Sequence, residues 1–130
     1  MEADRTGAAG EGTVHTMRLH GTAARLTILI DEADQWHHRP LYVEIVHRAH
    51  RDGLAGATVL RGIEGFTALS EIHSSHLFAL SEHLPIAIII VDNHQRIEKF
   101  LVTLEDLMSK GVVLVDDVKI IRYQADPRRR

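Results

Sequence analysis

Apolar and polar residues follow two rhythms along this chain, one typical of strands and the other of helices. In the stretch 25–30, Leu26, Ile28 and Ile30 fall on one face, which predicts a half-buried strand. The run 86–91 is continuously apolar, which is typical of a strand buried on both sides. The segments that we predict as strands are 25–30, 57–61, 86–91 and 112–123, the last with a polar interruption at Asp116–Asp117.

Two segments instead repeat apolar residues at the spacing of an α-helix. The first begins at Pro40, which suits a first helical turn, and ends at Asp52–Gly53, because glycine accepts the left-handed geometry of a helix end. The second begins at Asp92, whose carboxylate can accept an orphan backbone N–H. Gln95, three residues later, completes a capping-box pattern, and the helix ends at Lys110–Gly111.

The order of these elements predicts the fold. Strand, helix, strand, long loop, strand, helix and strand form the split βαβ pattern of an α+β, ferredoxin-like βαββαβ sandwich, a four-stranded antiparallel sheet with two helices on one face. Residues 31–39 and 67–84 are expected to be loops. Because the strand at 86–91 is apolar on both sides, the second face of the sheet also needs cover. Two helices cannot provide it, so we expect an oligomer in which another copy does.

Length and composition bound the domain organisation and the chemistry. The chain has 130 residues, the size of one domain, which we place at 25–123, with a disordered tail at 1–24 and a short basic tail at 124–130. The absence of cysteine excludes disulfides, thiolate nucleophiles and iron–sulfur clusters. So small a chain has little room for a deep pocket of its own, so a small ligand is expected between copies.

Charge and hydropathy exclude further classes. The formal net charge of −3 gives no general attraction to nucleic acid. The longest wholly apolar run, 86–91, is far shorter than the about 20 residues that a membrane-spanning helix needs. Residues 1–12 contain no apolar segment and do not form a secretory signal. We therefore expect a cytoplasmic protein that is neither embedded in a membrane nor bound to nucleic acid.

A glycine-containing stretch carries a resemblance to a known family. Residues 53–66 read Gly-Leu-Ala-Gly-Ala-Thr-Val-Leu-Arg-Gly-Ile-Glu-Gly-Phe. Shorter matches lie at 25–28, 36–37, 40–42, 72–73, 80–82, 84–85 and 91–92. Over 25–123 the sequence resembles an uncharacterised PII-like bacterial family, domain of unknown function one-ninety, which is similar to the PII nitrogen-signalling proteins. The resemblance implies a ferredoxin-like homotrimer that binds adenine nucleotides between subunits and engages partner proteins through the loop after its second strand.

The same resemblance implies site residues. Those implied for the nucleotide site are Gly56, Ala57, Thr58, Gly65, Phe66, Lys110, Gly111 and Arg122. Those implied for the partner loop within 67–84 are Thr67, Glu71, His73, Ser74 and His76. The chain departs from the PII pattern where phosphates bind, since Arg122 lacks a second arginine and Ile120 stands in that position. Either the ligand carries fewer phosphates than ATP, or the site has been lost.

The predicted function is a non-enzymatic, trimeric PII-like signal-transduction protein. Its effector is a small anion, an adenine nucleotide, and its target is a membrane transporter or an enzyme. One alternative is an interaction or structural protein with a vestigial pocket. Another is a histidine-dependent metal-binding protein, because Glu44, His47 and His50 recur at i, i+3 and i+6. No second unit of that kind is present, so we expect these residues to form a polar helix face and assign no metal ligands.

Catalysis has little support in the sequence. Ser74, Ser75, Ser81 and His83 are close in sequence, but no nucleophile elbow or oxyanion-loop motif surrounds them. No Walker loop or dinucleotide fingerprint is complete either. We therefore expect no catalytic residues.

Overall fold

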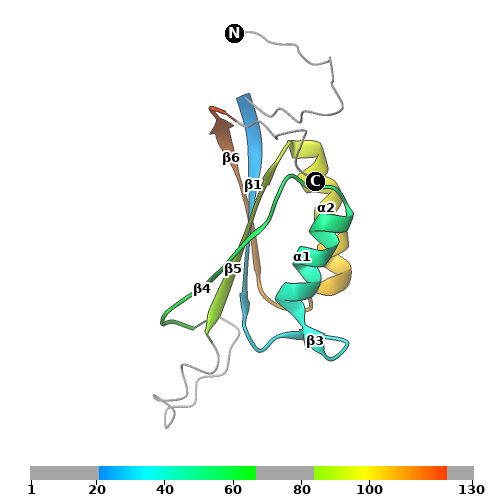
Figure 1. Ribbon diagram of the computed structural model, residues 1–130, viewed down its shortest axis with the longest axis vertical. Coiled ribbons are helices and arrows are strands. Elements are labelled where there is room, and N and C mark those ends of the chain that lie inside the picture. The colour runs from blue at the N-terminus through cyan, green and yellow to red at the C-terminus, as the bar shows by residue number, and fades with distance from the viewer. Residues whose placement is uncertain (1–20, 67–83, 123–130) are drawn as a thin grey trace, which may run out of the picture.

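An antiparallel sheet of four strands carries two helices on one of its faces (Figure 1). The structure is a computed structural model that describes residues 21–66 and 84–122. Its elements are β1 (Gly21–Asp31), β2 (Gln35–Trp36), β3 (Arg39–Pro40), α1 (Leu41–Arg51), β4 (Thr58–Arg61), β5 (Pro85–Asp92), α2 (His94–Leu107) and β6 (Val112–Ile120). The expected partner loop from Thr67 to His76 lies outside the described residues.

The strand order is β4-β5-β1-β6, and every neighbouring pair is antiparallel. The two long central strands are β1 and β5, and Ile28 of β1 lies opposite Ile88 of β5 and Val113 of β6. This arrangement is the predicted ferredoxin-like sandwich, in which strands far apart in sequence occupy the centre of the sheet. The fold class inferred from the sequence is thus confirmed.

The core fills the space between the sheet and the helices. Leu26 and Ile28 of β1 and Ile88 and Ile90 of β5 are fully buried, and Phe100 of α2 packs against them. Burying one such side chain contributes roughly 1.5–3 kcal/mol relative to leaving it exposed. The alternation of buried and partly exposed residues along β1 and β5 therefore fixes which face of each strand the helices cover.

The opposite face of the sheet has no helix over it (Figure 1). We call this the open face, and its apolar residues are Leu29, Leu60, Ala87, Ile89, Val91, Val112 and Leu114. Leu60 is 51% exposed and Leu114 is 49% exposed, although both are large and aliphatic. The prediction that helices alone leave one apolar face of the sheet uncovered matches this arrangement.

The first and last strands along the chain, β1 and β6, differ from the prediction. β1 begins at Gly21 rather than Arg25, and Ala23 and Ala24 are buried, so the expected tail at 1–24 is four residues too long. The cause is β6, whose register continues until Ile120 lies opposite Gly21. Of the tails expected at 1–24 and 124–130, residues 1–20 and 124–130 lie outside the described residues, so their disorder stays a prediction.

The polar pair Asp116–Asp117 does not interrupt the last strand, which is continuous and ends at Ile120 rather than residue 123. Alternate side chains of a strand point to opposite faces, so each carboxylate finds a separate partner. Asp116 pairs with Arg25 of β1, and Asp117 lies 2.8 Å from the His94 ring nitrogen Nε2. A partner on β1 for Asp116 and one at the start of α2 for Asp117 thus accommodate both charges.

The start of the second helix is also displaced. Asn93, not Asp92, caps α2, and its side chain accepts the backbone N–H of Arg96 at 2.8 Å. The predicted capping box with Gln95 is therefore wrong by one residue. Asp92 is instead the last residue of β5 and is fully buried.

The expected polar loop at 31–39 contains a short hairpin. Trp36 of β2 lies opposite Arg39 of β3, and the two residues between them, His37 and His38, form the turn. Within the described parts of the chain, no helix has the length and apolar character needed to cross a membrane.

Candidate functional site

The residues predicted to bind a nucleotide fall at two opposite ends of the sheet. At the end where Asp31 lies opposite Pro85, the turn after β4 brings Gly65 and Phe66, and the turn before β6 brings Lys110 and Gly111. We call this the Pro85 end. The residues Gly56, Ala57, Thr58 and Arg122 lie toward the other end, where Asp92 lies opposite Ala24.

One protomer cannot bring all of these residues onto a small ligand. The nine residues of β6 separate Gly111 from Arg122. At about 3.4 Å per residue they span roughly 30 Å. Thr58 and Arg122 also lie on opposite edges of the sheet, on or next to β4 and β6. A single site that uses both groups requires more than one copy of the chain.

The turn after β4 is fixed by close approach to Pro85. The backbone N–H of Gly62 donates to the carbonyl of Pro85 at 2.8 Å, and a Cβ on Gly62 would lie 2.8 Å from Pro85 Cγ. Only glycine fits there without displacing the proline ring. Phe66, a few residues on, is 68% exposed, so its ring does not pack into the core of this protomer. An exposed ring at this position is available to a ligand or to another copy.

The conformation of the turn before β6 explains why glycine stands at position 111. Gly111 has φ +119°, and a Cβ there would lie 2.8 Å from Met108 Cε and 3.1 Å from the carbonyl oxygen of Leu29. Lys110 Nζ lies 3.4 Å from Asp34 Oδ1, so its charge already has a partner within the chain. Packing and an internal ion pair therefore explain this turn without a ligand.

The Asp92 end holds a buried carboxylate that orders the glycine-rich loop. Asp92 accepts the backbone N–H of Ala55 at 2.9 Å and that of Asn93 at 2.7 Å. Arg96 Nη1 lies 3.8 Å from the same carboxylate and donates to the carbonyl of Gly53 at 3.0 Å. These contacts tie the loop between α1 and β4 to the junction of β5 and α2. They place the backbone that leads into Thr58.

Sequence reasoning missed this role because it treated Asp92 as a helix cap. The available signal was its position at the end of a continuously apolar strand, where a carboxylate must find donors if it is buried. The sequence could not name those donors, because one is the backbone of Ala55, 37 residues away.

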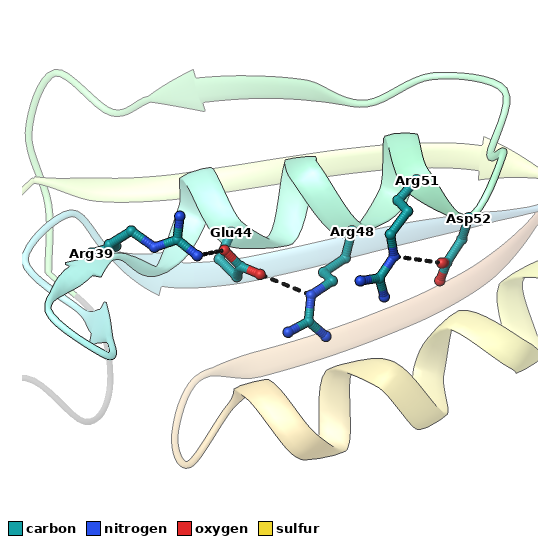
Figure 2. Close-up of polar contacts among 5 residues, drawn as sticks. All are labelled: Arg39, Glu44, Arg48, Arg51 and Asp52. Carbon is teal, nitrogen blue, oxygen red and sulfur yellow. Dashed lines mark hydrogen bonds and ion pairs between the residues drawn. The ribbon is translucent and has the colours of Figure 1, made fainter.

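A second cluster, also missed, joins the hairpin to α1 (Figure 2). The Glu44 carboxylate, 8% exposed, accepts from Arg39 Nη2 at 2.7 Å and from Arg48 Nε at 2.8 Å. The guanidiniums of Arg39 and Arg48 lie 5.8 and 5.1 Å from the centre of the Trp36 ring. The ring of His37 stacks on Trp36 at 3.9 Å.

The cluster changes the interpretation of Glu44. The sequence grouped it with His47 and His50 as a conceivable metal site, but two arginines occupy its oxygens. Among residues 21–66 and 84–122, no group of three histidines or carboxylates is arranged to hold a metal ion.

A third polar contact lies on the open face. Arg25 of β1 donates to both oxygens of Asp116 on β6, at 3.1 and 2.8 Å. This hydrogen bonding holds the pKa of Asp116 below its ordinary value of 3.8, while loss of hydration acts in the opposite direction. The Arg25–Asp116 pair lies next to the apolar residues of the open face.

Known proteins with similar sequences cover most of this chain. The family model DUF190, described as "Uncharacterized ACR", matches residues 23–120. A UPF0166 protein of Aquifex aeolicus is 35% identical over 98 residues, which is 74% of this chain and 90% of that protein. A UPF0166 protein of Methanocaldococcus jannaschii is 30% identical over 98 residues, with 75% and 90% covered.

Solved structures share the fold at lower identity. CPII of Thiomonas intermedia K12, bound to ADP, AMP and acetate, aligns with a TM-score of 0.55 at 18% identity, over 77% of this chain and 89% of that one. A putative PII-like signalling protein of Thermus thermophilus aligns at 0.55 and 15% identity, over 78% and 91%. The B. subtilis GlnK–ATP complex aligns at 0.50 and 12% identity, over 77% and 84%. The chain therefore belongs to the DUF190 family and has the fold of PII-like proteins.

Proposed function

We propose that this chain is a cytoplasmic PII-like regulatory protein that binds an adenine nucleotide between three copies of itself. The observation that carries the proposal is the fold shared with CPII, whose structures contain ADP and AMP. Bound nucleotide would favour one state of the segment 67–84, which then binds or releases a transporter or an enzyme. We expect no catalysis by this chain.

Two features of the described residues support a site between copies. The predicted nucleotide residues lie at opposite ends of one protomer, so a neighbour must supply part of any site that uses both groups. The open face also leaves Leu60 and Leu114 about half exposed, as an apolar surface between copies would be in one isolated protomer. Phosphate-binding charge is sparse, which favours AMP or ADP over ATP.

Calorimetric titration of the intact oligomer with AMP, ADP, ATP and cyclic nucleotides tests this proposal. We expect saturable binding of AMP or ADP, weakened by Arg122→Gln and Thr58→Val. Lys119→Gln, which removes an exposed charge from β6, serves as the matched control. Light scattering that shows a monomer would contradict the site between copies. Absence of binding at millimolar nucleotide would overturn the nucleotide assignment.

One observation favours the alternative of an interaction protein with a vestigial pocket. Gly111 and Lys110 are both accounted for by contacts within the chain, to Met108 and to Asp34. If Lys110→Gln leaves nucleotide affinity unchanged while Arg122→Gln abolishes it, the turn before β6 has only a structural role. If no variant matters because nothing binds, the alternative replaces the proposal.

A further inference from the structure

The cluster around Glu44 has more positive than negative charge. Arg39 and Arg48 share the single carboxylate of Glu44, so one unit of positive charge stays uncompensated at the surface. The Arg48 side chain is 20% exposed and bonds Glu44 through Nε, and neither of its Nη groups has a hydrogen-bond acceptor among the described residues. Paired Nη groups suit the two oxygens of a carboxylate.

A third arginine extends this charge along α1. Arg51, one turn beyond Arg48, is 63% exposed, and its pairing with Asp52 is loose at 3.6 Å. Figure 2 shows Arg39, Arg48 and Arg51 on one side of the helix, in line with its axis. We call these three residues the arginine row. An elongated row fits an extended chain with several carboxylates better than one compact anion.

The aromatic part of the cluster adds apolar contact surface. Trp36 is partly exposed beside the arginines, and its ring is parallel to that of His37 within 5°. Tryptophan and arginine are the residue types most often found at energetic centres of protein interfaces. A ring fixed by stacking and by two guanidiniums loses little entropy when a partner binds.

The hairpin turn carries backbone strain that glycine would avoid. His37 and His38 have φ values of 49° and 70°, the left-handed region at both turn positions. Such two-residue turns strongly prefer Asn-Gly, because most side chains are strained in the left-handed region. The chain instead holds two exposed imidazoles next to the arginine row, which points to a functional reason for the turn.

From these observations we propose that the arginine row, with Trp36, is a docking surface for a carboxylate-rich segment of a partner protein. The surface lies on the helix side of the sheet, away from the open face, so assembly through the open face leaves it accessible (Figure 1). It differs from the partner loop expected at 67–84 and does not depend on nucleotide binding.

Trp36 reports directly on this surface because it is the one tryptophan of the chain. The full-length protein is titrated with a hexaglutamate peptide at low salt, and separately with inorganic phosphate, while Trp36 emission is followed. We expect a saturable change with hexaglutamate at lower concentration than with phosphate. High salt should weaken the binding, because much of it is electrostatic.

Four variants make the test specific. Arg39→Gln and Arg51→Gln should each weaken hexaglutamate binding by about tenfold, the loss of one charge-assisted contact. Arg39→Lys should restore only part of it, because lysine lacks the forked geometry. Lys99→Gln, an exposed charge on α2, should leave binding unchanged. Arg51 does not touch Glu44, so that variant remains informative if Arg39→Gln disturbs the hairpin.

Three outcomes would overturn the proposal. The first is no saturable change with hexaglutamate. The second is equal weakening by Lys99→Gln and Arg51→Gln, which would show diffuse attraction to the whole surface. The third is phosphate binding at least as tight as hexaglutamate binding, which would show a compact anion site.

Discussion

Both faces of the sheet are rich in aliphatic residues, but within one protomer only one of them is buried. On the helix-covered face, Ile28 and Ile88 are fully buried. On the open face, Ile89 is only partly buried, and Leu114 is about half exposed. The first face stabilises the single chain. The second has the composition of a core but no cover, so its apolar surface is available for assembly.

The two faces also differ in how they hold a carboxylate. Asp92, on the covered face, is fully buried and accepts the backbone N–H groups of Ala55, in the loop before β4, and of Asn93. Asp116, on the open face, is exposed and takes both donors from the Arg25 side chain. Of these two carboxylates, the buried one thus organises the backbone, whereas the exposed one pairs with a side chain. Four predictions test this contrast.

The largest expected effect is that of a cavity under the helices. Ile88→Ala should lower the free energy of unfolding by about 3–4 kcal/mol, because the fully buried side chain leaves a space that its neighbours cannot fill. Ile89→Ala, the matched substitution on the open face, should lower the free energy of unfolding by under about 1 kcal/mol in dilute protein. Urea unfolding of both variants measures the difference. Equal losses in dilute protein would show that the two faces are not distinct.

A charge on the open face should act on assembly rather than on folding. Leu114→Glu is expected to convert the proposed oligomer to monomers, because burying an unpaired carboxylate between copies is unfavourable. The circular dichroism spectrum should stay that of the wild type. Sedimentation velocity measures the change, and Glu105→Gln on α2 is the control for a change of charge elsewhere. An unchanged oligomer would mean that Leu114 lies outside the interface.

Removing the charge of Asp92 should loosen the glycine-rich loop. Asp92→Asn keeps the size but replaces one acceptor by a donor, so Ala55 or Asn93 loses a strong partner. We expect a loss of about 1–3 kcal/mol in stability. In this variant, hydrogen exchange of the Ala55 amide should accelerate more than that of amides in β1. Uniform acceleration across the sheet would instead indicate a general loss of stability.

The smallest effect concerns pH and Asp116. Because Arg25 lowers the pKa of Asp116 in the folded chain, this pair stabilises the fold at pH values above the ordinary 3.8. The contribution is lost as the pH falls through the lowered pKa. Asp116→Asn should therefore reduce stability slightly at neutral pH and have no effect in strong acid. A difference in stability between Asp116→Asn and the wild type that persists in strong acid would contradict the assigned cause.

Repeating this stability measurement at different salt concentrations tests whether the open face is exposed or covered by another copy. In an exposed pair, added salt should remove most of the difference between Asp116→Asn and the wild type. If another copy covers the face, the pair is shielded and the salt effect should be smaller at high protein concentration.

Much of the fold could be predicted from the sequence, because it depends on local periodicity. The alternation around Leu26 and Ile28 and the apolar run at 86–91 placed the two central strands correctly. The errors fall where partners distant in sequence decide. Pairing with β6 extends β1 back to Gly21, and the donor at Ala55 draws Asp92 into the interior, so that Asn93 caps α2.

The candidate sites divide in the same way. The sequence could name the glycines and Lys110, since turn chemistry and a family resemblance depend on residue identity. It could not show that Gly111 has a φ of +119° next to the carbonyl oxygen of Leu29, or that Lys110 is paired with Asp34. Neither could it find the arginine row, because Arg39 and Arg48 meet only when the hairpin folds against α1.

By itself, the sequence determined the fold class, the uncovered apolar face and the family. These follow from which residue types recur at which spacing, and a local pattern is enough to set them. The tertiary structure alone decided which carboxylates are buried and which arginines converge. A buried charge needs hydrogen-bond donors, and packing can supply them from residues far away in the sequence. The separation of two residues along the chain does not show whether they lie close together in space.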